Sequence, residues 1–223
     1  MGASCDIMES SRCVTANESS ERMKIKKSSE KYVASYSDTF DNVAREGKFL
    51  SISAGYPLQD MIDFIRACRQ CGYPQFLLIN GDDQAVGWCD IVRRADEPDD
   101  VGFLGVGIRK EYRHRGLGSK LMTATIQDAL KRGFHEIRLE VRTSNENAIR
   151  TYCRLGFVKI AHIRDGVVTD GVAEDIWLMS LYAREIVSRD FSGKRFLKRF
   201  PKLKYQFRPK TSEKSVAEGE KNA

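Results

Sequence analysis

The sequence predicts an α/β fold, in which a β-sheet carries helices on its faces. Apolar residues recur every three or four positions in some segments and alternate in others, so both helices and strands are expected along one chain. The length of 223 residues suits one ordinary domain with room for extensions at its ends. The expected order is strand, two helices, three strands, helix, strand, helix and two strands.

The chain is expected to begin with a mostly disordered leader over residues 1–30, because Ser, Glu and Lys dominate that stretch and its periodicity is weak. Tyr32–Tyr36 alternates and is the first predicted strand. Asp38 or Asp41 is a candidate N-cap for a short helix that runs through Glu46.

The next predicted elements are a helix and a β-hairpin. Pro57 suits the first turn of the helix, and Gly72 ends it. Gln75–Asn80 and Gln84–Arg93 are predicted strands joined by a turn at residues 81–83. The apolar stripe of the helix consists of Met61, Phe64, Ile65 and Cys68.

The rest of the body alternates between strands and helices and closes on two strands. The first of these strands contains three glycines, which mark a bulge or a close backbone approach. The last two strands are expected to meet at a turn formed by Asp165 and Gly166. The elements are Val101–Ile108, a helix over 116–132, His135–Arg142, a helix over Asn145–Leu155, Phe157–Ile163 and Ala173–Leu181.

Positive charge is concentrated at one end of the chain. Residues 191–223 hold ten Lys and Arg against three Glu, an excess that accounts for the whole net charge of +6. Residues 191–210 interleave basic and aromatic side chains, which suits a solvated extension, a nucleic-acid or ribosome contact, or an anionic membrane surface. No apolar run approaches the ~18 residues of a membrane span and no signal-peptide core is present, so we expect a cytoplasmic protein.

The six cysteines do not form a metal or disulfide pattern. Only Cys68 and Cys71 are spaced as C-x-x-C, and they lie in a helical segment without a second pair or suitably spaced histidines. We therefore expect reduced cysteines, as in cytoplasmic proteins, and no bound metal.

The segment Glu111–Lys120 carries the strongest chemical signal. It joins a predicted strand to a predicted helix and reads EYRHRGLGSK. Its glycines allow a ligand to approach the backbone, and the unpaired N–H groups of a first helical turn attract an anion such as a phosphate. The P-loop pattern G-x-x-x-x-G-K-[ST] is missing, and Leu121 stands where a Rossmann fingerprint has its third glycine.

Two motifs identify a family resemblance. Residues 113–118, RHRGLG, resemble the R/Q-x-x-G-x-G/A pyrophosphate loop of the GNAT superfamily of acyl-CoA N-acyltransferases. Residues 145–157, NENAIRTYCRLGF, resemble the family's second motif, N-x-x-A-I-x-x-Y followed by G-F. Residues 164–179 are similar to the closing hairpin of bacterial members that acetylate amino acids, small amines or protein amino termini.

The resemblance implies a mixed, mostly antiparallel sheet of about seven strands flanked by helices, with a splayed pair of parallel strands that holds the cofactor. It covers about residues 31–183, so we expect an acyl-CoA N-acyltransferase domain there and a basic C-terminal extension over residues 184–223. Dimers are common in this superfamily, so the implied partners include a second copy of the chain.

The resemblance also implies a site for acetyl-CoA. The pyrophosphate would lie on the backbone of His114–Ser119, and the pantetheine arm would pair with the strand edge at Val106–Ile108. Asn145 would hold the arm from the far side while it caps its helix. A bulge at Gly105 and Gly107 would splay the strands. The expected cofactor-binding residues are Val106, Gly107, Ile108, Arg113, His114, Arg115, Gly116, Leu117, Gly118, Ser119, Asn145 and Tyr152.

Tyr152 stands at the position whose hydroxyl protonates the leaving thiolate in many family members, a role that suits a phenol with a pKa of about 10. The alternative is an ordinary core aromatic. Glu140 is the candidate general base, and its alternative is an exposed carboxylate paired with Arg138 or Arg142.

Many relatives instead place a base on the strand before the loop. This chain has Phe103 and Leu104 around that position, so the other candidates are Asp90, Glu111 or a chain of water molecules. Cys89 and Cys153 are expected to be packing residues rather than acyl carriers, because no His–Asp relay lies near them in the sequence.

The implied activity is transfer of an acetyl group from acetyl-CoA to a primary amine in a ternary complex. The expected acceptor is a small amine or amino acid, with a protein or peptide amino group close behind. Two alternatives stay open. One is a non-catalytic acyl-CoA-binding module, and the other is an RNA- or ribosome-associated protein that acts through its basic extension.

Overall fold

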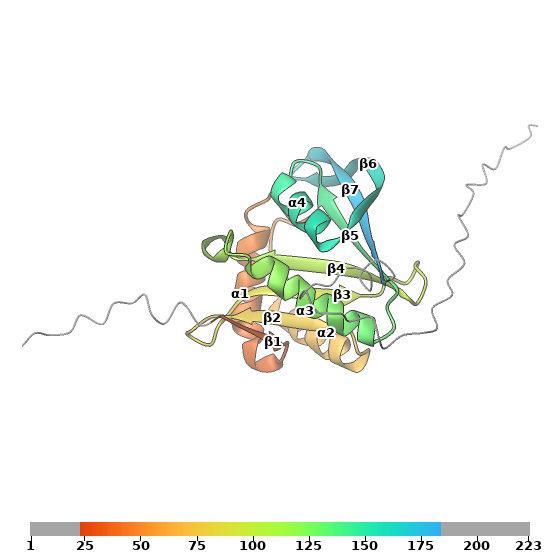
Figure 1. Ribbon diagram of the computed structural model, residues 1–223. Helices are drawn as coiled ribbons and strands as arrows, with labels where there is room; N and C mark the ends of the chain where they lie inside the picture. The colour runs from red at the N-terminus through yellow and green to blue at the C-terminus, as the bar shows by residue number, and fades with distance from the viewer. Residues whose placement is uncertain (1–22, 184–223) are drawn as a thin grey trace, which may run out of the picture. The chain divides into compact units, whose positions relative to one another are not determined.

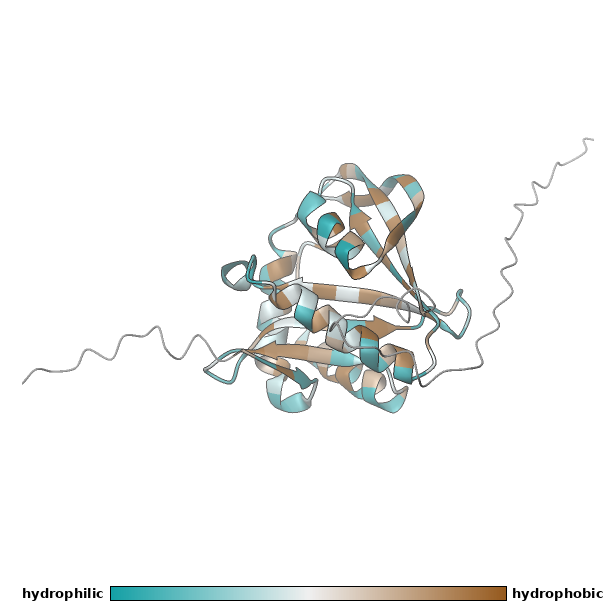
Figure 2. Ribbon diagram, in the orientation of Figure 1, coloured by the Kyte–Doolittle hydropathy of each residue, from teal (hydrophilic) through white to brown (hydrophobic). Residues whose placement is uncertain are grey.

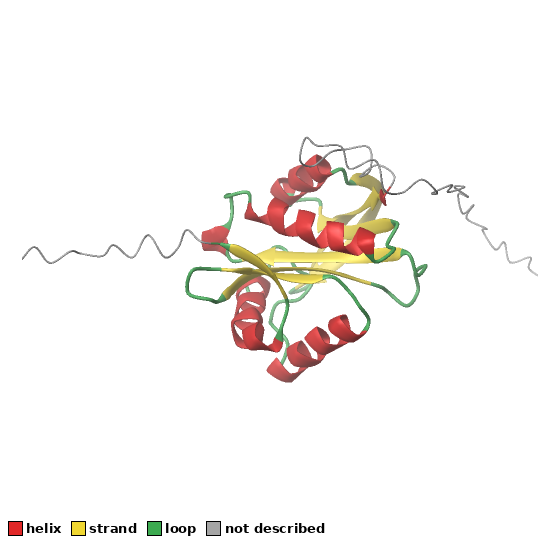
Figure 3. Cartoon of the chain, turned by 60° about the horizontal axis from the view of Figure 1, so that its bottom comes forward, coloured by secondary structure: helices red, strands yellow, loops and turns green. Residues whose placement is uncertain are grey.

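The computed structural model describes residues 23–183, which form one sheet between two layers of helices (Figures 1 and 3). The seven strands lie in the order β1-β2-β3-β4-β5-β7-β6, and every neighbouring pair is antiparallel except β4 and β5. This confirms the mixed, mostly antiparallel sheet that was expected. The elements are β1 (Lys24–Lys27), α1 (Val33–Ala44), α2 (Leu58–Gln70), β2 (Gln75–Ile79), β3 (Ala85–Val92), β4 (Val101–Ile108), α3 (Leu117–Lys131), β5 (Glu136–Arg142), α4 (Glu146–Leu155), β6 (Val158–Thr169) and β7 (Val172–Tyr182), with short 3₁₀ turns at Glu30–Tyr32 and Lys110–Tyr112.

The two helical layers form two apolar cores. α1 and α2 cover one face of the sheet, where Tyr36 and Ile65 pack among residues of β2 and β3. α3 and α4 cover the other face, where Leu121 and Leu155 pack among residues of β3, β4, β5 and β7. Figure 2 shows the matching pattern, with brown central strands and helices that also carry teal surfaces. Burial on both faces explains why β3 is apolar along most of its length.

The N-terminal expectations need two corrections. Residues 24–27 form β1 and pair with β2, so the leader cannot extend through residue 30. Tyr32–Tyr36 is not a strand, because Tyr32 ends a 3₁₀ turn and α1 begins at Val33. The two tyrosines are four residues apart and both are buried, a spacing that fits one face of a helix as well as one face of a strand.

The expected cap of α1 is also wrong, because neither Asp38 nor Asp41 lies at its start. Asp41 instead accepts hydrogen bonds from Arg45 Nε at 2.6 Å and from the Gly55 N–H at 2.8 Å. It therefore connects the end of α1 to the loop that precedes α2. The residues 1–22 of the leader and 184–223 of the basic extension lie outside the described part of the chain.

The closing hairpin turns five residues later than expected. Asp170 and Gly171 both have positive φ, +52° and +79°, and they join Thr169 to Val172. Positive φ at both central residues is the requirement of a type I′ hairpin turn. The other Asp-Gly pair, at 165 and 166, lies inside β6, where the register with β7 shifts between Ile163 and Val167. It is an irregularity within the strand and not the turn.

The remaining elements agree with the sequence prediction to within a few residues. No helix among residues 23–183 is long and apolar enough to cross a membrane.

Candidate functional site

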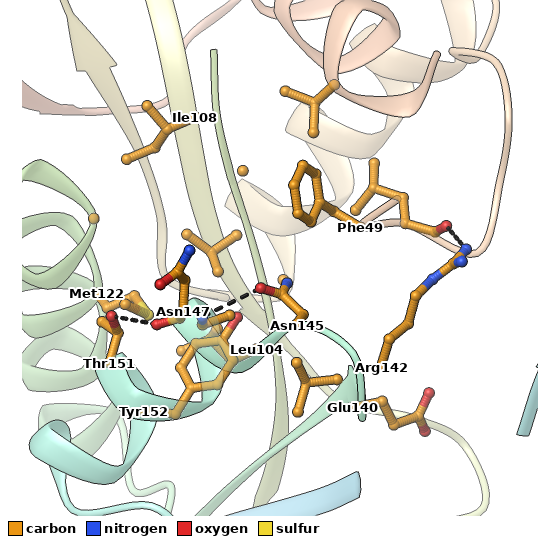
Figure 4. A pocket seen from close by; sticks show the side chains of 18 of the residues that line it. Phe49, Leu104, Ile108, Met122, Glu140, Arg142, Asn145, Asn147, Thr151 and Tyr152 are labelled. Carbon is orange, nitrogen blue, oxygen red and sulfur yellow. Dashed lines mark hydrogen bonds between the residues drawn. The ribbon is translucent and has the colours of Figure 1, made fainter. Parts of the chain in front are cut away.

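The parallel strands β4 and β5 separate after a short contact. Their pairing covers three residues of each strand and stops at Phe103 and Arg138. On its other side, β4 stays paired with β3 as far as Ile108. A cleft of about 750 Å³ opens where the strands part, lined by both of them and by α3 and α4 (Figure 4). The expected splay is therefore confirmed, and it leaves a stretch of the β4 edge without a strand partner from the described part of the chain.

The start of α3 forms one wall of this cleft. His114 and Gly116 have positive φ, +61° and +72°, which turn the chain sharply into the helix. The first N–H groups of the helix have no carbonyl partner within it and lie at the positive end of the helix dipole. A Cβ at Gly118 would meet only Ile108 Cδ1, at 3.4 Å, so the backbone there is uncrowded. This wall suits an anion of the size of a pyrophosphate.

Arg113 lines the cleft but already has protein partners. Its Nε donates to the carbonyl oxygen of Ile108 at 2.7 Å, and its two Nη atoms form a bidentate ion pair with Glu46. Its guanidinium lies 4.8 Å from the centre of the Phe49 ring. Arg113 therefore connects the loop before α3 to the loop between α1 and α2. A contact with a ligand would come in addition to this structural role.

Arg115 is the one expected cofactor-binding residue that does not line the cleft. It donates to the carbonyl oxygen of Glu111 at 2.9 Å. Two other arginines, Arg150 and Arg154 of α4, do line it and were missed by the sequence prediction. Their i, i+4 spacing places them on one side of α4, which is the signal that could have revealed them.

The glycines of β4 make room for side chains rather than for a bulge. The register between β3 and β4 is continuous from Gly87 and Ile108 to Val92 and Phe103, so the expected bulge is absent there. A Cβ at Gly107 would lie 2.1 Å from Trp88 Cη2, and one at Gly105 would lie 3.1 Å from Asp90 Oδ1. Because Gly107 and Gly105 have no side chain, Trp88 and Asp90 of β3 can pack directly against β4.

α4 presents Asn145 and Tyr152 to the cleft (Figure 4). Asn145 is the N-cap, and its Oδ1 accepts from the N–H of Ala148 at 3.2 Å, as the sequence predicted. Tyr152 is 9% exposed and its ring centre is 5.9 Å from that of Phe157. Burial raises the pKa of its hydroxyl well above the usual value, so the phenol stays protonated at neutral pH.

Glu140 lies on β5, just beyond the point where the strands part, and lines the same cleft. Its Oε1 accepts from Arg94 Nη1 at 2.7 Å, so its partner is neither Arg138 nor Arg142. The Arg94 guanidinium lies 3.7 Å from the centre of the Phe103 ring, which holds it in a stacked position. A carboxylate and a phenol thus both line the cleft beside the free β4 edge, a combination suited to proton transfer.

The alternative bases lie elsewhere. Asp90 is buried on β3, in front of Gly105, and does not line the cleft. Burial raises its pKa to about 7, and its carboxylate makes no hydrogen bond with a described residue. Glu111 is exposed and does not line the cleft either.

The buried Arg142 connects the segments that form another wall of the cleft. Arg142 Nη2 donates to the carbonyl oxygen of Leu50 at 2.8 Å and to Thr169 Oγ1 at 2.6 Å, and Nη1 pairs with Glu174. It therefore joins the loop between α1 and α2 to the closing hairpin. The apolar side chains of that wall could not be located from the sequence, because three separate segments supply them: Val43, Phe49, Leu50, Val167 and Ile176.

The β6 irregularity shapes the same wall. A Cβ at Gly166 would lie 2.5 Å from Ile176 Cγ1, so only glycine allows this close approach of β6 to β7. Gly166 and Val167 then line the cleft.

The cysteines of the described region are free thiols, and residues 23–183 contain no cluster of three or more His, Cys, Asp or Glu that could hold a metal. Cys89 is completely buried, and burial raises its pKa. Burial likewise raises the pKa of Cys68 to about 12.

Curated proteins with similar sequences include acetyltransferases from several organisms. A stretch of 83 residues is 34% identical to the [ribosomal protein bS18]-alanine N-acetyltransferase of Escherichia coli K12, covering 37% of this chain and 56% of that enzyme. A stretch of 52 residues is 42% identical to the mycothiol acetyltransferase of Corynebacterium aurimucosum, covering 23% of this chain and 17% of that one. The matches thus span less than two thirds of either relative.

Solved structures show the same fold. An acetyltransferase of the GNAT family from Streptococcus pneumoniae superposes with a TM-score of 0.67 at 24% identity, covering 72% of this chain and 99% of that one. A phosphinothricin acetyltransferase from Sinorhizobium meliloti, solved with acetyl-CoA, has a TM-score of 0.69 at 12% identity and covers 78% and 95%.

The family model that matches this chain spans residues 41–157, just over half of its length. That segment runs from α1 through α4, and so contains the free β4 edge, the α3 wall and the second motif on α4. The chain belongs to the acetyltransferase (GNAT) family.

Proposed function

We propose that the protein is an acetyl-CoA-dependent N-acetyltransferase that acts on a primary amine by direct transfer in a ternary complex. The observation that carries the proposal is the convergence on one cleft of the free β4 edge, the first turn of α3, the Tyr152 phenol and the Glu140 carboxylate.

The cleft fits acetyl-CoA part by part. The unpaired edge at Val106–Ile108 offers backbone groups to the two amides of a pantetheine arm, in the manner of an added strand. The N–H groups between His114 and Ser119 suit the pyrophosphate. Arg150 and Arg154 bring further positive charge to the wall formed by α4.

Bound acetyl-CoA would supply an activated thioester. The chain's own residues would then handle the protons: Glu140 accepts one from the incoming ammonium, and Tyr152 donates one to the departing sulfur. A C–N bond forms as the C–S bond breaks, and the products are an acetamide and a free thiol. The position of Tyr152 in the lining of the cleft supports the donor role, because a phenol is protonated at neutral pH and can give its proton to a thiolate beside it.

A route through an acyl-cysteine has less support. Cys89 is fully buried, and burial raises the pKa of its thiol. Cys153, which follows Tyr152, is exposed and does not line the cleft. A nucleophilic cysteine needs the opposite, a lowered pKa and access to the substrate. Free thiols also fit the cytoplasmic location that we propose.

The acceptor class is the open part of this proposal. The curated relatives named above act on a ribosomal protein and in mycothiol chemistry, so kinship alone favours neither a protein nor a small molecule. We propose a small amine or amino acid first and a protein or peptide amino group second. The acyltransferase domain would end near residue 183, and the basic extension that would make any ribosome contact lies outside the described residues. A homodimer is part of the same proposal.

The proposal is tested by acetyl-CoA binding and turnover. Calorimetry should give saturable binding to wild type that is lost in Gly118→Trp, where a large side chain would occupy the α3 wall, and kept in Gln127→Trp on the exposed side of the same helix. Thiol release with a panel of primary amines, with mass spectrometry of the products, then measures transfer.

The role of Tyr152 is tested by removing its hydroxyl alone. Tyr152→Phe should lower kcat roughly a hundredfold or more while acetyl-CoA binding is unchanged, as loss of a general acid predicts. Tyr73→Phe, the same change in a half-buried tyrosine outside the cleft, should be silent. Binding without turnover of any amine would support the non-catalytic alternative, and no binding at millimolar acetyl-CoA would refute the proposal.

A further inference from the structure

The arginines that line the cleft differ in how fully they are paired with other groups of the protein. Among the described residues that line the cleft, Glu140 is the single acidic side chain, whereas five are arginines. Of those arginines, Arg113 is paired with Glu46, and Arg142 with Glu174, Leu50 and Thr169. Arg150 and Arg154 belong to the α4 wall. Arg94, on the segment after β3, is the remaining cation beside Glu140.

Arg94 is held in place but has donors to spare. Its guanidinium stacks on the Phe103 ring at 3.7 Å, and one N–H group donates to Glu140 at 2.7 Å. Its other N–H groups make no hydrogen bond with a described residue, and the side chain is 46% exposed. A stacked guanidinium with free N–H groups is preorganised to bind a second carboxylate.

From these contacts we infer that the acceptor is an apolar α-amino acid with a free carboxylate, and that Arg94 is the residue that selects it. This inference rests on the proposed acetyl transfer. The acceptor ammonium would lie at Glu140 and its carboxylate at Arg94, so that the zwitterion pairs with a carboxylate and a guanidinium that are already side by side. Its side chain would face the apolar wall formed by Val43, Leu50, Val167 and Ile176.

The same charges disfavour other acceptors. A polyamine carries two or more positive charges, and residues 23–183 bring only one carboxylate to the lining of the cleft to receive them. A peptide amino terminus or a lysine side chain has no carboxylate next to its amine, so Arg94 would have nothing to bind but Glu140.

Matched acceptors test the inference on the full-length protein. The set is L-leucine, L-leucinamide, 3-methylbutylamine and spermidine, together with a short peptide that has leucine at its amino terminus. L-leucine should exceed L-leucinamide in kcat/KM by about tenfold to a hundredfold, the usual effect of a charge-assisted hydrogen bond. 3-Methylbutylamine, which lacks the carboxylate altogether, should behave like the amide.

Arg94→Gln should remove this preference mainly through KM. The KM for L-leucine should rise at least tenfold while kcat changes little, and L-leucinamide should be affected far less. The matched control is Arg93→Gln, because the neighbouring Arg93 pairs with Asp99 and lies over the Phe134 ring, outside the cleft. Unchanged melting temperature and acetyl-CoA binding would show that both variants are folded.

Each outcome has one meaning. Amide or amine turnover equal to that of L-leucine in wild type, or faster turnover of spermidine or the peptide, would overturn the inference while leaving acetyl transfer intact. A carboxylate preference that survives in Arg94→Gln would overturn the role of Arg94. Absence of turnover with every acceptor would refute the proposed function itself.

Discussion

Replacing Asp90 by Asn should remove a loss of stability that wild type undergoes as the pH rises. Asp90 is 7% exposed, and its carboxylate has no hydrogen-bond donor among the described residues. Burial raises its pKa from 3.8 to about 7, because the charged form loses its hydration. The pKa values of the neighbouring Tyr36 and Cys68 are also raised. Burial is the main cause for both, and the charge of Asp90 adds to it.

The sign and size follow from linkage. Between pH 3.8 and about 7 the folded protein keeps the Asp90 proton and the unfolded chain loses it, so the free energy of unfolding falls as pH rises. The difference between a pKa of 3.8 and one of about 7 corresponds to about 4 kcal/mol of unfolding free energy over the whole window. About 3 kcal/mol of that loss falls between pH 5 and pH 8, and the Asn variant avoids it.

The assay is urea unfolding of wild type and Asp90→Asn at pH 5, 6, 7 and 8. The variant should gain about 3 kcal/mol relative to wild type from the lowest to the highest pH, because all other titrations cancel in the difference. Asp99→Asn, whose side chain is 97% exposed, should show no such trend. A difference between wild type and Asp90→Asn that stays constant with pH would refute the assignment of a buried, high-pKa carboxyl.

Three further substitutions test the geometry of the cleft. Gly107→Ala should lower the free energy of unfolding by about 1–3 kcal/mol, because its Cβ would lie 2.1 Å from the Trp88 ring; urea unfolding measures it. Gly116→Ala should cost about 1 kcal/mol through its φ of +72°, with no steric clash, and should be read from the melting temperature. Asn145→Ala should cost about 1 kcal/mol, because the Ala148 N–H loses its cap; the same unfolding assay applies.

Internal controls separate these effects. Gly118→Ala, whose Cβ would make only an ordinary contact, should leave stability nearly unchanged or raise it, since alanine favours helices. If Gly107→Ala were as mild as Gly118→Ala, the close packing of Trp88 against β4 would be wrong. Asn145→Asp should retain the cap, so equal losses for Ala and Asp would argue against capping as the cause.

The sequence predicted the parts of the protein that local patterns encode. The apolar spacing of α2, the glycine at the start of α3 and the Asn cap of α4 are local signals, and the structure has these elements where they were expected. Tyr32–Tyr36 misled because two buried positions four residues apart satisfy alternation and helical spacing equally well. The two Asp-Gly pairs of the closing hairpin are also alike locally, and only the register with β7 decides which one turns.

The charged contacts of the cleft were beyond such patterns. Arg94 and Glu140 are 46 residues apart, and Arg113 and Glu46 are 67 apart, so only the folded sheet brings these partners together. The apolar acceptor wall comes from α1, the following loop and the hairpin for the same reason. The motifs contain the residues that we propose to hold acetyl-CoA, but they do not contain the residues that we propose to select the acceptor.

The short parallel contact between β4 and β5 has a consequence for how the protein responds to its ligand. Only three residue pairs join β1–β4 to β5, β7 and β6, so the two parts of the sheet are paired at one end and separated at the other. A ligand that pairs with the free edge would extend this pairing, and amide hydrogen exchange along residues 104–108 should slow as it binds. The melting temperature should climb with ligand concentration, since a molecule that binds only the folded state stabilises it by mass action. Acetyl-CoA would then be both a reactant and a removable structural part of the sheet.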